Sequence, residues 1–257
     1  MLCGMHEASP EVFELLGHPV RWGLVRALAA SDLRVGELVE EVGERQNLVS
    51  YHLGLLRRAG LVAERRSSAD GRDVYYRLDL ARLQADLDRA AHAIHRGFRV
   101  VAQQDVDEGG VDRPSRVLFV CTGNSARSQI AESVLNHLSR GAVEIASAGH
   151  RPVGVHPLAL RVLAGLGLPS DGLRSKGLAE VIGIDFDHVV TLCDVARQEF
   201  PDLPGKPGRI HWSLPDPAAA EGSESDQLRA FEQTAAELRV RIAFALPVLQ
   251  KRQRDAA

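Results

Sequence analysis

Cysteine is scarce in this chain, because only Cys3, Cys121 and Cys193 occur among 257 residues. Three thiols are too few for a disulfide scaffold, so we expect a reducing, cytoplasmic compartment in which cysteines act chemically. The sequence also lacks any apolar run of about 18 residues, and we therefore expect no membrane span. The first residues lack the basic and apolar regions of a signal peptide, which argues against secretion.

Lysine is also scarce: Lys176, Lys206 and Lys251 are the only lysines among 31 basic residues. This arginine bias, with abundant alanine, glycine and leucine, suggests a GC-rich bacterial genome. The formal net charge is only −3, so any affinity for nucleic acid has to be local. A hydrophobic content of 45% and a charged content of 25% are typical of a soluble globular protein, and the length suffices for two domains.

A polar, glycine-containing segment at residues 101–114 separates two patterns and is interpreted as a linker. After it, strand-like apolar runs alternate with helical patterns. The runs lie at 116–121, 143–147 and 187–193, and the helical patterns lie at 128–140, 157–166 and 225–250. This alternation predicts an α/β domain with a parallel sheet and helices on both faces. The chemistry of such a sheet lies at the carboxyl ends of its strands, where Cys121 and Cys193 both fall.

The part before the linker is mainly helical, with apolar residues at helical spacing. One short amphipathic helix is predicted to end at Gly43, and another begins near Gln46. Two short helices joined by a tight glycine-containing turn indicate a helix-turn-helix, although a plain three-helix core has the same pattern. Strand-like runs at 61–66 and 72–78 around a Gly-containing loop then predict a wing hairpin.

The strongest pattern for function follows the apolar run that ends at Val120. Cys121 ends the predicted strand, Arg127 follows after five residues, and Ser128 opens an amphipathic helix. The backbone N–H groups of such a loop and the N-terminus of the helix favour a bound tetrahedral anion and the thiolate form of the cysteine. Arg127 can hold two anion oxygens in a bidentate fork, and Ser128 can donate a hydrogen bond to the sulfur.

The predicted oxyanion-binding residues form one continuous stretch. They are Thr122, Gly123, Asn124, Ser125, Ala126, Arg127 and Ser128. Asn124 tolerates the left-handed backbone that such a turn needs. The alternative interpretation is a buried cysteine beside an ordinary strand-to-helix turn, and the strand before the loop and the helix after it argue against that alternative.

The stretch CTGNSARSQ at residues 121–129 resembles the phosphate loop of the low-molecular-weight tyrosine phosphatases and of the arsenate reductases that share their fold. The resemblance covers residues 115–250 and includes Ser147–Gly149 and Val189–Cys193. Two places favour the reductases. Cys193 stands where they carry a cysteine, and their His-Trp and Asp-Pro pairs match His211-Trp212 and Asp216-Pro217. The phosphatases have aromatic residues after Asp-Pro, where this chain has three alanines.

This resemblance implies a role for each of three side chains. Cys121 attacks arsenic as the nucleophile, Asp216 protonates the leaving oxygen as general acid, and Cys193 is the second thiol. For Asp216 the alternative is a turn residue before Pro217, and for Cys193 it is a buried strand cysteine. The best-known thioredoxin-coupled reductases use a third cysteine, but this chain has Phe200 at that position.

The missing third cysteine leaves two routes for the electrons. Either a Cys121–Cys193 disulfide forms and an external reductant opens it, or a small thiol attacks the adduct directly. The implied reductant is mycothiol or glutathione acting with a redoxin, and the GC-rich composition favours mycothiol. We expect no bound cofactor. Ala126 departs from the relatives as well, because many of them carry a cysteine there.

Residues 11–100 resemble the winged-helix repressors of the ArsR family, with matching text at 47–53, 56–62 and 70–78. The resemblance implies two sets of DNA-binding residues. Gln46, Asn47, Ser50 and Tyr51 point into the major groove, and Arg66 and Arg72 flank a groove from the wing. A helix at 81–99 is expected to pair with its counterpart, giving a homodimer on a near-palindromic operator.

The same resemblance bears on metal sensing. Arsenic-sensing members carry a cysteine pair on the first helix of the motif, where residues 33–38 of this chain contain no thiol. Zinc-sensing members use ligands that correspond to Asp79, His92 and His95, but Ala81 replaces an intervening histidine. Two solvated histidines one helical turn apart are the favoured alternative, so no metal site is predicted.

These patterns predict a winged helix-turn-helix domain at 11–100, a linker at 101–114 and a phosphatase-like α/β domain at 115–250. The predicted function is thiol-dependent reduction of arsenate to arsenite in arsenical resistance, fused to an ArsR-type transcription regulator. One alternative is a low-molecular-weight protein-tyrosine phosphatase. The other is a DNA-binding regulator whose C-terminal domain only senses an oxyanion. The expected partners are arsenate, operator DNA and a redoxin.

Overall fold

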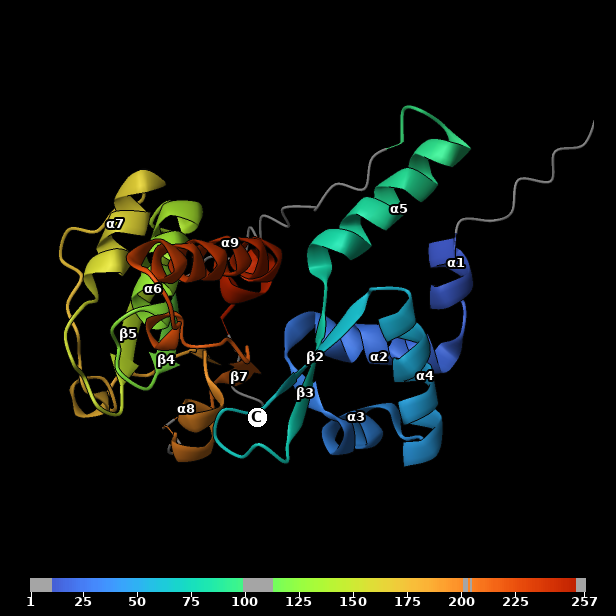
Figure 1. Cartoon of the computed structure of the whole chain (residues 1–257), viewed down its shortest axis with the longest axis horizontal. Helices are drawn as coiled ribbons and strands as arrows, with labels where there is room; N and C mark the ends of the chain where they lie inside the picture. Colours follow the sequence, from blue (N-terminus) through green and yellow to red (C-terminus); the bar gives the residue numbers. More distant parts are fainter. Residues whose placement is uncertain (1–10, 99–112, 201–202, 204, 253–257) are drawn as a thin grey trace, which may run out of the picture. The chain divides into compact units, whose positions relative to one another are not determined.

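The computed structural model describes residues 11–98, 113–200, 203 and 205–252, and the described residues divide into two compact units (Figure 1). The first unit contains residues 11–65 and 73–98. The second contains residues 66–72 and the described residues from 113 onward. The predicted domain boundaries stay predictions, because residues 101–112 of the predicted linker lie outside the described part of the chain.

Four helices open the first unit. They are α1 (Glu11–Leu16), α2 (Pro19–Ala30), α3 (Val35–Val42) and α4 (Gln46–Arg58), with the short strand β1 (Leu33–Arg34) before α3. Gly43 ends α3 with φ 73°, a left-handed conformation that glycine adopts without steric penalty, and its N–H bonds to the Val39 carbonyl. The turn between α3 and α4 is therefore the tight turn that the sequence predicts for a helix-turn-helix.

The predicted wing strands are β2 (Val62–Arg66) and β3 (Val74–Leu78), in a sheet of order β1-β3-β2. Helix α5 (Leu80–Ile94) follows. The sequence predicts this helix over 81–99, but it ends at Ile94 because His95 has an extended backbone and its ring accepts the N–H of Gly97. The core of the unit is aliphatic and includes Val20, Leu24, Leu28, Leu38, Val49, Leu53, Leu56 and Leu61.

The second unit is built on a parallel sheet, as predicted. Its strands are β4 (Ser115–Cys121), β5 (Val143–Gly149), β6 (His188–Thr191) and β7 (Gly208–His211), in the order β5-β4-β6-β7. All three pairings are parallel, so the carboxyl ends of the strands share one edge. The sequence analysis missed β7, whose four residues contain only one strongly apolar side chain, Ile210.

The helices of the second unit are α6 (Arg127–Ser139), α7 (Pro157–Gly165), α8 (Asp194–Glu199) and α9 (Glu224–Leu249), with 3₁₀ turns η1 (Leu178–Glu180) and η2 (Pro217–Ala219). Helix α6 packs on β4, β5 and α9, and α8 packs on β4 and β6 (Figure 1). Among the described residues, no helix combines the length and the apolar character that crossing a membrane requires.

Candidate active site and nucleic-acid interface

The loop from Cys121 to Arg127 joins the end of the central strand β4 to the start of α6. Asn124 has φ 43°, the left-handed conformation predicted for it. Gly149, at the end of the neighbouring strand, lets the loop come close. A Cβ on that residue would lie 2.6 Å from the Asn124 nitrogen and 2.7 Å from the Thr122 oxygen. The site therefore depends on a glycine in β5 as well as on the loop itself.

Cys121 lies at the floor of this loop, and its side chain is a free, buried thiol. Its Sγ is 3.0 Å from the Ser128 Oγ. The same hydroxyl oxygen accepts a hydrogen bond from Asn124 Nδ2 at 2.8 Å, which leaves the single hydroxyl hydrogen for the sulfur. The N-terminus of α6 adds a positive partial charge at the same place, where an anionic ligand is stabilised.

Arg127 is buried, and its guanidinium group is only partly satisfied. Its Nη1 donates to the Leu214 carbonyl at 3.1 Å, and its Nη2 pairs with Asp216 Oδ2 at 2.8 Å. Its Nε is buried and has no hydrogen-bond partner within the described part of the chain. A buried donor without an acceptor is costly, so this N–H points to an anionic ligand.

Asp216 makes the contact of a turn residue, one of the two interpretations that the sequence left open, and it also lies next to Arg127. Its Oδ1 accepts the Ala218 N–H at 3.1 Å and so begins the 3₁₀ turn η2, which is the role of a turn residue. Its Oδ2 pairs with Arg127, and 44% of its side chain is exposed. The carboxyl group thus lies between Arg127 and solvent, and its role as general acid stays a prediction.

Cys193 is the second buried free thiol of the unit, and it follows β6. Its Sγ lies 3.3 Å from Thr122 Oγ1, on the residue next to Cys121. The structure therefore brings Cys193 to the oxyanion loop, across 71 residues of sequence. Phe200, where a relay would need a third cysteine, is buried just after α8.

Several functional residues were missed by the sequence analysis because they lie behind the loop. Asn124 Nδ2 also donates to Ser147 Oγ, and Asn124 Oδ1 accepts from Gln129 Nε2 and the Lys176 N–H. Ser147 belongs to the Ser-Ala-Gly segment quoted in the resemblance, which was a usable signal. Gln129 is the last residue of the quoted stretch 121–129, which was a usable signal as well. Glu132 and Lys176 carried none, since no local spacing links them.

The predicted DNA-reading residues of the first unit lie together on one helix. Gln46, Asn47, Ser50 and Tyr51 are all exposed on α4, and Tyr51 is 60% exposed. The opposite face of α4 is buried through Val49, Leu53 and Leu56. This division leaves the polar face of α4 available for contact with another molecule.

Arg66 and Arg72 lie at the two ends of the loop between β2 and β3, and both are exposed. Arg66 donates to the Gly71 carbonyl at 3.1 Å, and Arg72 pairs with Asp70 at 2.8 Å. The Arg72 side chain is 91% exposed, so this ion pair is weak and the guanidinium group is accessible to a phosphate.

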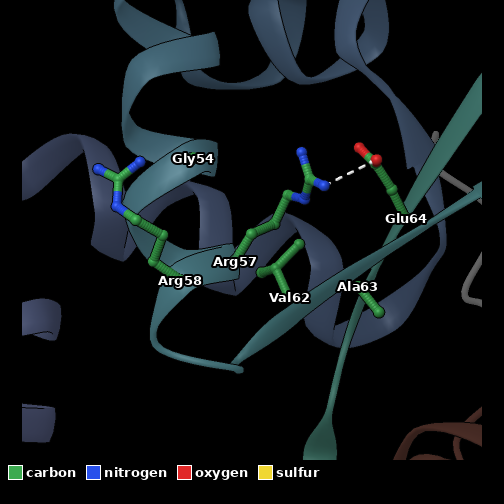
Figure 2. Close-up of a pocket in the computed structure, with 6 residues that line it drawn as sticks. All are labelled: Gly54, Arg57, Arg58, Val62, Ala63 and Glu64. Atoms are coloured by element: carbon green, nitrogen blue, oxygen red, sulfur yellow. Dashed lines mark hydrogen bonds and ion pairs between the residues drawn. The ribbon is translucent and has the colours of Figure 1, made fainter.

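Figure 2 shows a pocket between the end of α4 and β2, lined by Gly54, Arg57, Arg58, Val62, Ala63 and Glu64. Arg57 points toward Glu64 and pairs with it at 2.7 Å (Figure 2). The side chains of this pair are 44% and 40% exposed, whereas the Arg127 site holds a buried Nε that has no partner among the described residues.

The three residues considered for zinc lie at separated positions of α5. Asp79 caps its start by accepting the Arg82 N–H, and His95 follows its end. In the part of the chain that the structure describes, no group of three or more His, Cys, Asp or Glu side chains is arranged to hold a metal ion.

The family model of the low molecular weight phosphotyrosine protein phosphatases matches residues 116–254. The chain belongs to this family. A model described as a helix-turn-helix domain matches residues 16–65. The two matches confirm the predicted combination of a helix-turn-helix segment with a phosphatase-type α/β domain.

Relatives within the phosphatase family include reductases. The chain is 35% identical over 130 residues to an arsenate reductase of Shouchella clausii, covering 49% of this chain and 91% of the relative. It is 33% identical over 122 residues to an arsenate reductase of Bacillus subtilis, covering 48% and 88%.

Similar solved structures include both reductases and phosphatases. "An arsenate reductase in the phosphate binding state" is 26% identical, with a TM-score of 0.44, covering 53% of this chain and 99% of that one. The YwlE arginine phosphatase from Geobacillus stearothermophilus is 26% identical, with a TM-score of 0.44, covering 53% and 94%.

Proposed function

We propose that the second unit reduces arsenate to arsenite, with thiols supplying the electrons. The observation that carries this proposal is the second buried thiol, because Cys193 Sγ lies 3.3 Å from the hydroxyl of the residue that follows Cys121. Hydrolysis of a phosphate ester needs one nucleophile and an acid, and it has no use for a second thiol. The relatives named arsenate reductases support the same choice.

The first step binds and captures the substrate. Arsenate has the shape and charge of phosphate, so Arg127 and the loop N–H groups can hold it without rearrangement. The Cys121 thiolate attacks arsenic and forms an S–As bond. One As–O bond breaks, and that oxygen leaves as water after Asp216 provides a proton.

The second step moves two electrons. A thiolate attacks the Cys121 sulfur, an S–S bond forms and the S–As bond breaks. The electron pair of that bond stays on arsenic, which leaves as arsenite while two thiols become a disulfide. Cys193, whose Sγ lies beside Thr122, is the candidate thiol within the chain, and a small external thiol is the other candidate.

The disulfide needs an external reductant for the next cycle. We propose mycothiol or glutathione acting with a redoxin in the cytoplasm, because position 200 is Phe and no cysteine follows Cys193 in the sequence. The test measures arsenate-dependent NADPH consumption with thioredoxin, glutaredoxin/glutathione and mycoredoxin/mycothiol systems side by side. We expect one of the two small-thiol systems to support turnover. Efficient turnover with thioredoxin alone would contradict this assignment.

Assays on the same purified protein distinguish the reductase from two alternatives, a tyrosine phosphatase and an oxyanion sensor. A tyrosine phosphatase needs an aromatic wall for its substrate, but η2 after Asp216 consists of Pro217 and two alanines. Release of phosphate from aryl phosphates without arsenate reduction would establish that alternative. A pure oxyanion sensor would bind arsenate and release nothing, so arsenite formation decides against it.

We also propose that the first unit binds operator DNA as a homodimer of the ArsR type. The exposed polar face of α4 supports the DNA contact, and exposed apolar residues support the pairing. Phe13 on α1, Ile94 at the end of α5 and Phe98 after it are 44%, 66% and 52% exposed. Sedimentation of the full chain is expected to give a dimer, and Ile94→Glu is expected to shift it toward the monomer. A wild-type monomer at micromolar concentration would contradict this assignment.

A further inference from the structure

A buried ion pair lies behind the oxyanion loop and is linked to it by hydrogen bonds. Lys176 Nζ lies 3.3 Å from Glu132 Oε2, and the side chains are only 12% and 17% exposed. Glu132 is on α6, whereas Lys176 precedes η1. None of the steps proposed above uses these two residues, so their connection to the loop needs an explanation.

The first link of the network is the Asn124 amide, whose orientation is fixed. Its Oδ1 accepts the Lys176 N–H at 2.6 Å and Gln129 Nε2 at 2.9 Å. Both partners are donors, so the Nδ2 hydrogens have to face the other way. They meet Ser128 Oγ and Ser147 Oγ, each at 2.8 Å.

The two serines extend the hydrogen-bond network from Asn124 in two directions, toward Cys121 and toward Glu132. Each hydroxyl has one hydrogen, and each oxygen already accepts from Asn124. A Cys121 thiolate accepts only, so in that state Ser128 directs its hydrogen at Sγ, while Ser147 directs its hydrogen at Glu132 Oε2. An ionised carboxylate accepts only, so Ser147 cannot reverse its hydrogen bond as long as Glu132 is charged. The path runs from Glu132 through Ser147, Asn124 and Ser128 to the sulfur.

We propose that Glu132 and Lys176 are a positioning pair, which fixes the hydrogen-bond direction beneath the loop and thereby stabilises the Cys121 thiolate. This inference rests on the proposed role of Cys121 as nucleophile. Lys176 contributes twice. Its ammonium group keeps the carboxylate in place, and its backbone N–H orients Asn124. Its carbonyl also accepts the N–H of Gly149, the residue that closes on the loop.

The test replaces Glu132 by glutamine in the full chain. Glutamine has nearly the same shape but keeps only one acceptor oxygen, and its other terminal atom donates. Ser147 and Lys176 then share a single neutral acceptor, so the direction of the Ser147 hydrogen bond is no longer fixed by a charge. The rate at which iodoacetamide alkylates Cys121 is measured against pH by mass spectrometry of its peptide. We expect the midpoint of this profile to move upward by about half a unit to one unit, since a hydrogen bond to the charged form is weakened. Lys176→Met, which keeps the backbone N–H, is expected to move it in the same direction.

Glu144→Gln is the matched control. Glu144 pairs with Arg116 at 2.6 Å, is 50% exposed and lies on β5, the strand that carries Ser147. Its substitution removes an ion pair of the same kind and is expected to leave the midpoint unchanged. A midpoint unchanged in both Lys176→Met and folded Glu132→Gln would overturn the inference. If Glu132→Gln fails to fold, Lys176→Met decides by the same measurement.

Alkylation needs no arsenate, so this test stands apart from the proposed function. A shifted midpoint in a chain that does not reduce arsenate would support the positioning pair and contradict the reductase. An unshifted midpoint in an active reductase would do the opposite. Loss of stability alone, with the midpoint unchanged, would assign the pair a purely structural role.

Discussion

At the scale of single residues, the oxyanion site is marked by a buried arginine N–H without a hydrogen-bond partner and by a free thiol. Arg127 has two of its nitrogens satisfied by Leu214 and Asp216, and its buried Nε has no partner among the described residues. Cys121 receives a hydrogen bond from Ser128 and has no covalent partner. A tetrahedral oxyanion fits between them, because it offers acceptors to the arginine and an electrophilic centre to the sulfur.

Cys193 gives a direct test of the electron route. Arsenate added to the reduced wild type, without external thiol, is expected to form one arsenite and consume two thiols per chain. Cys193→Ser is expected to form none under these conditions, because no second thiol reaches the adduct. Thiol titration with arsenic speciation measures both quantities. Equal arsenite yields in the two proteins once a small thiol is added, and none from either without it, would instead make Cys193 a structural residue.

His52 makes the stability of the first unit depend on pH. His52 lies on α4 and is buried, its Nδ1 has no partner in the described residues, and the centroid of its ring is 4.2 Å from that of His18. Burial lowers the pKa of His52, and the charges of His18 and Arg21 lower it further, against the effect of Glu44. As the pH falls, His52 therefore binds a proton in the unfolded chain before it does so in the folded chain.

The sign of the His52 effect follows from this difference. The contribution of neutral His52 to the free energy of unfolding is fully present above the ordinary histidine pKa of about 6.5. It falls as the pH drops below that value, because the unfolded state then binds more protons. Urea unfolding followed by Trp22 fluorescence, in a Trp212→Phe background, measures it. His52→Gln is expected to be less stable throughout and to lose less stability between about pH 7.5 and about pH 5. An equal loss in both proteins would assign the acid sensitivity to other groups.

At the scale of elements, helix α4 separates a buried from an exposed face, and this division predicts how it reads DNA. Asn47→Ala or Tyr51→Ala is expected to cost about 1–3 kcal/mol of operator binding and to relax base preference, because we predict that these side chains contact the bases. Arg72→Ala is expected to weaken binding to all sequences alike, as loss of a phosphate contact does. Titrations against the operator and a scrambled duplex measure both effects. A uniform loss for Asn47→Ala would contradict the assignment.

The observed bounds of the strands and helices can be compared with those that the sequence predicts. Strands β4 and β5 and helix α6 match their predicted ranges within two residues, and α4 begins at Gln46 as predicted, because apolar spacing and flanking turns define these elements locally. The loop from Cys121 to Ser128 was predicted for the same reason. Helix α5 ends before its predicted limit because His95 binds Gly97, and β7 has too few apolar residues to be recognised. The network of Ser147, Glu132 and Lys176 was missed because its contacts join distant parts of the chain.

At the scale of the whole molecule, the question is whether arsenate affects DNA binding. Every residue of the oxyanion site described here belongs to the second unit, as do the predicted wing residues Arg66 and Arg72, whereas the α4 face belongs to the first. Coupling requires that arsenate bind differently to the DNA-bound and the free protein. We expect arsenate to leave operator affinity within a factor of about three, below typical allosteric couplings. Titrations with and without saturating arsenate test this. A tenfold shift in wild type that is absent from Cys121→Ser would make the second unit the sensor.

The reduction of arsenate by the Cys121 thiolate is the central claim, and arsenite formation measures it most directly. Arsenic speciation follows arsenate and arsenite in the full chain supplied with mycothiol or glutathione and the matching redoxin. Cys121→Ser is expected to form no arsenite, because a serine hydroxyl stays protonated where the thiol ionises. Arg127→Ala is expected to lose at least about a hundredfold in turnover, as loss of a preorganised anion contact does. Arsenite formation at the wild-type rate by Cys121→Ser would contradict the account.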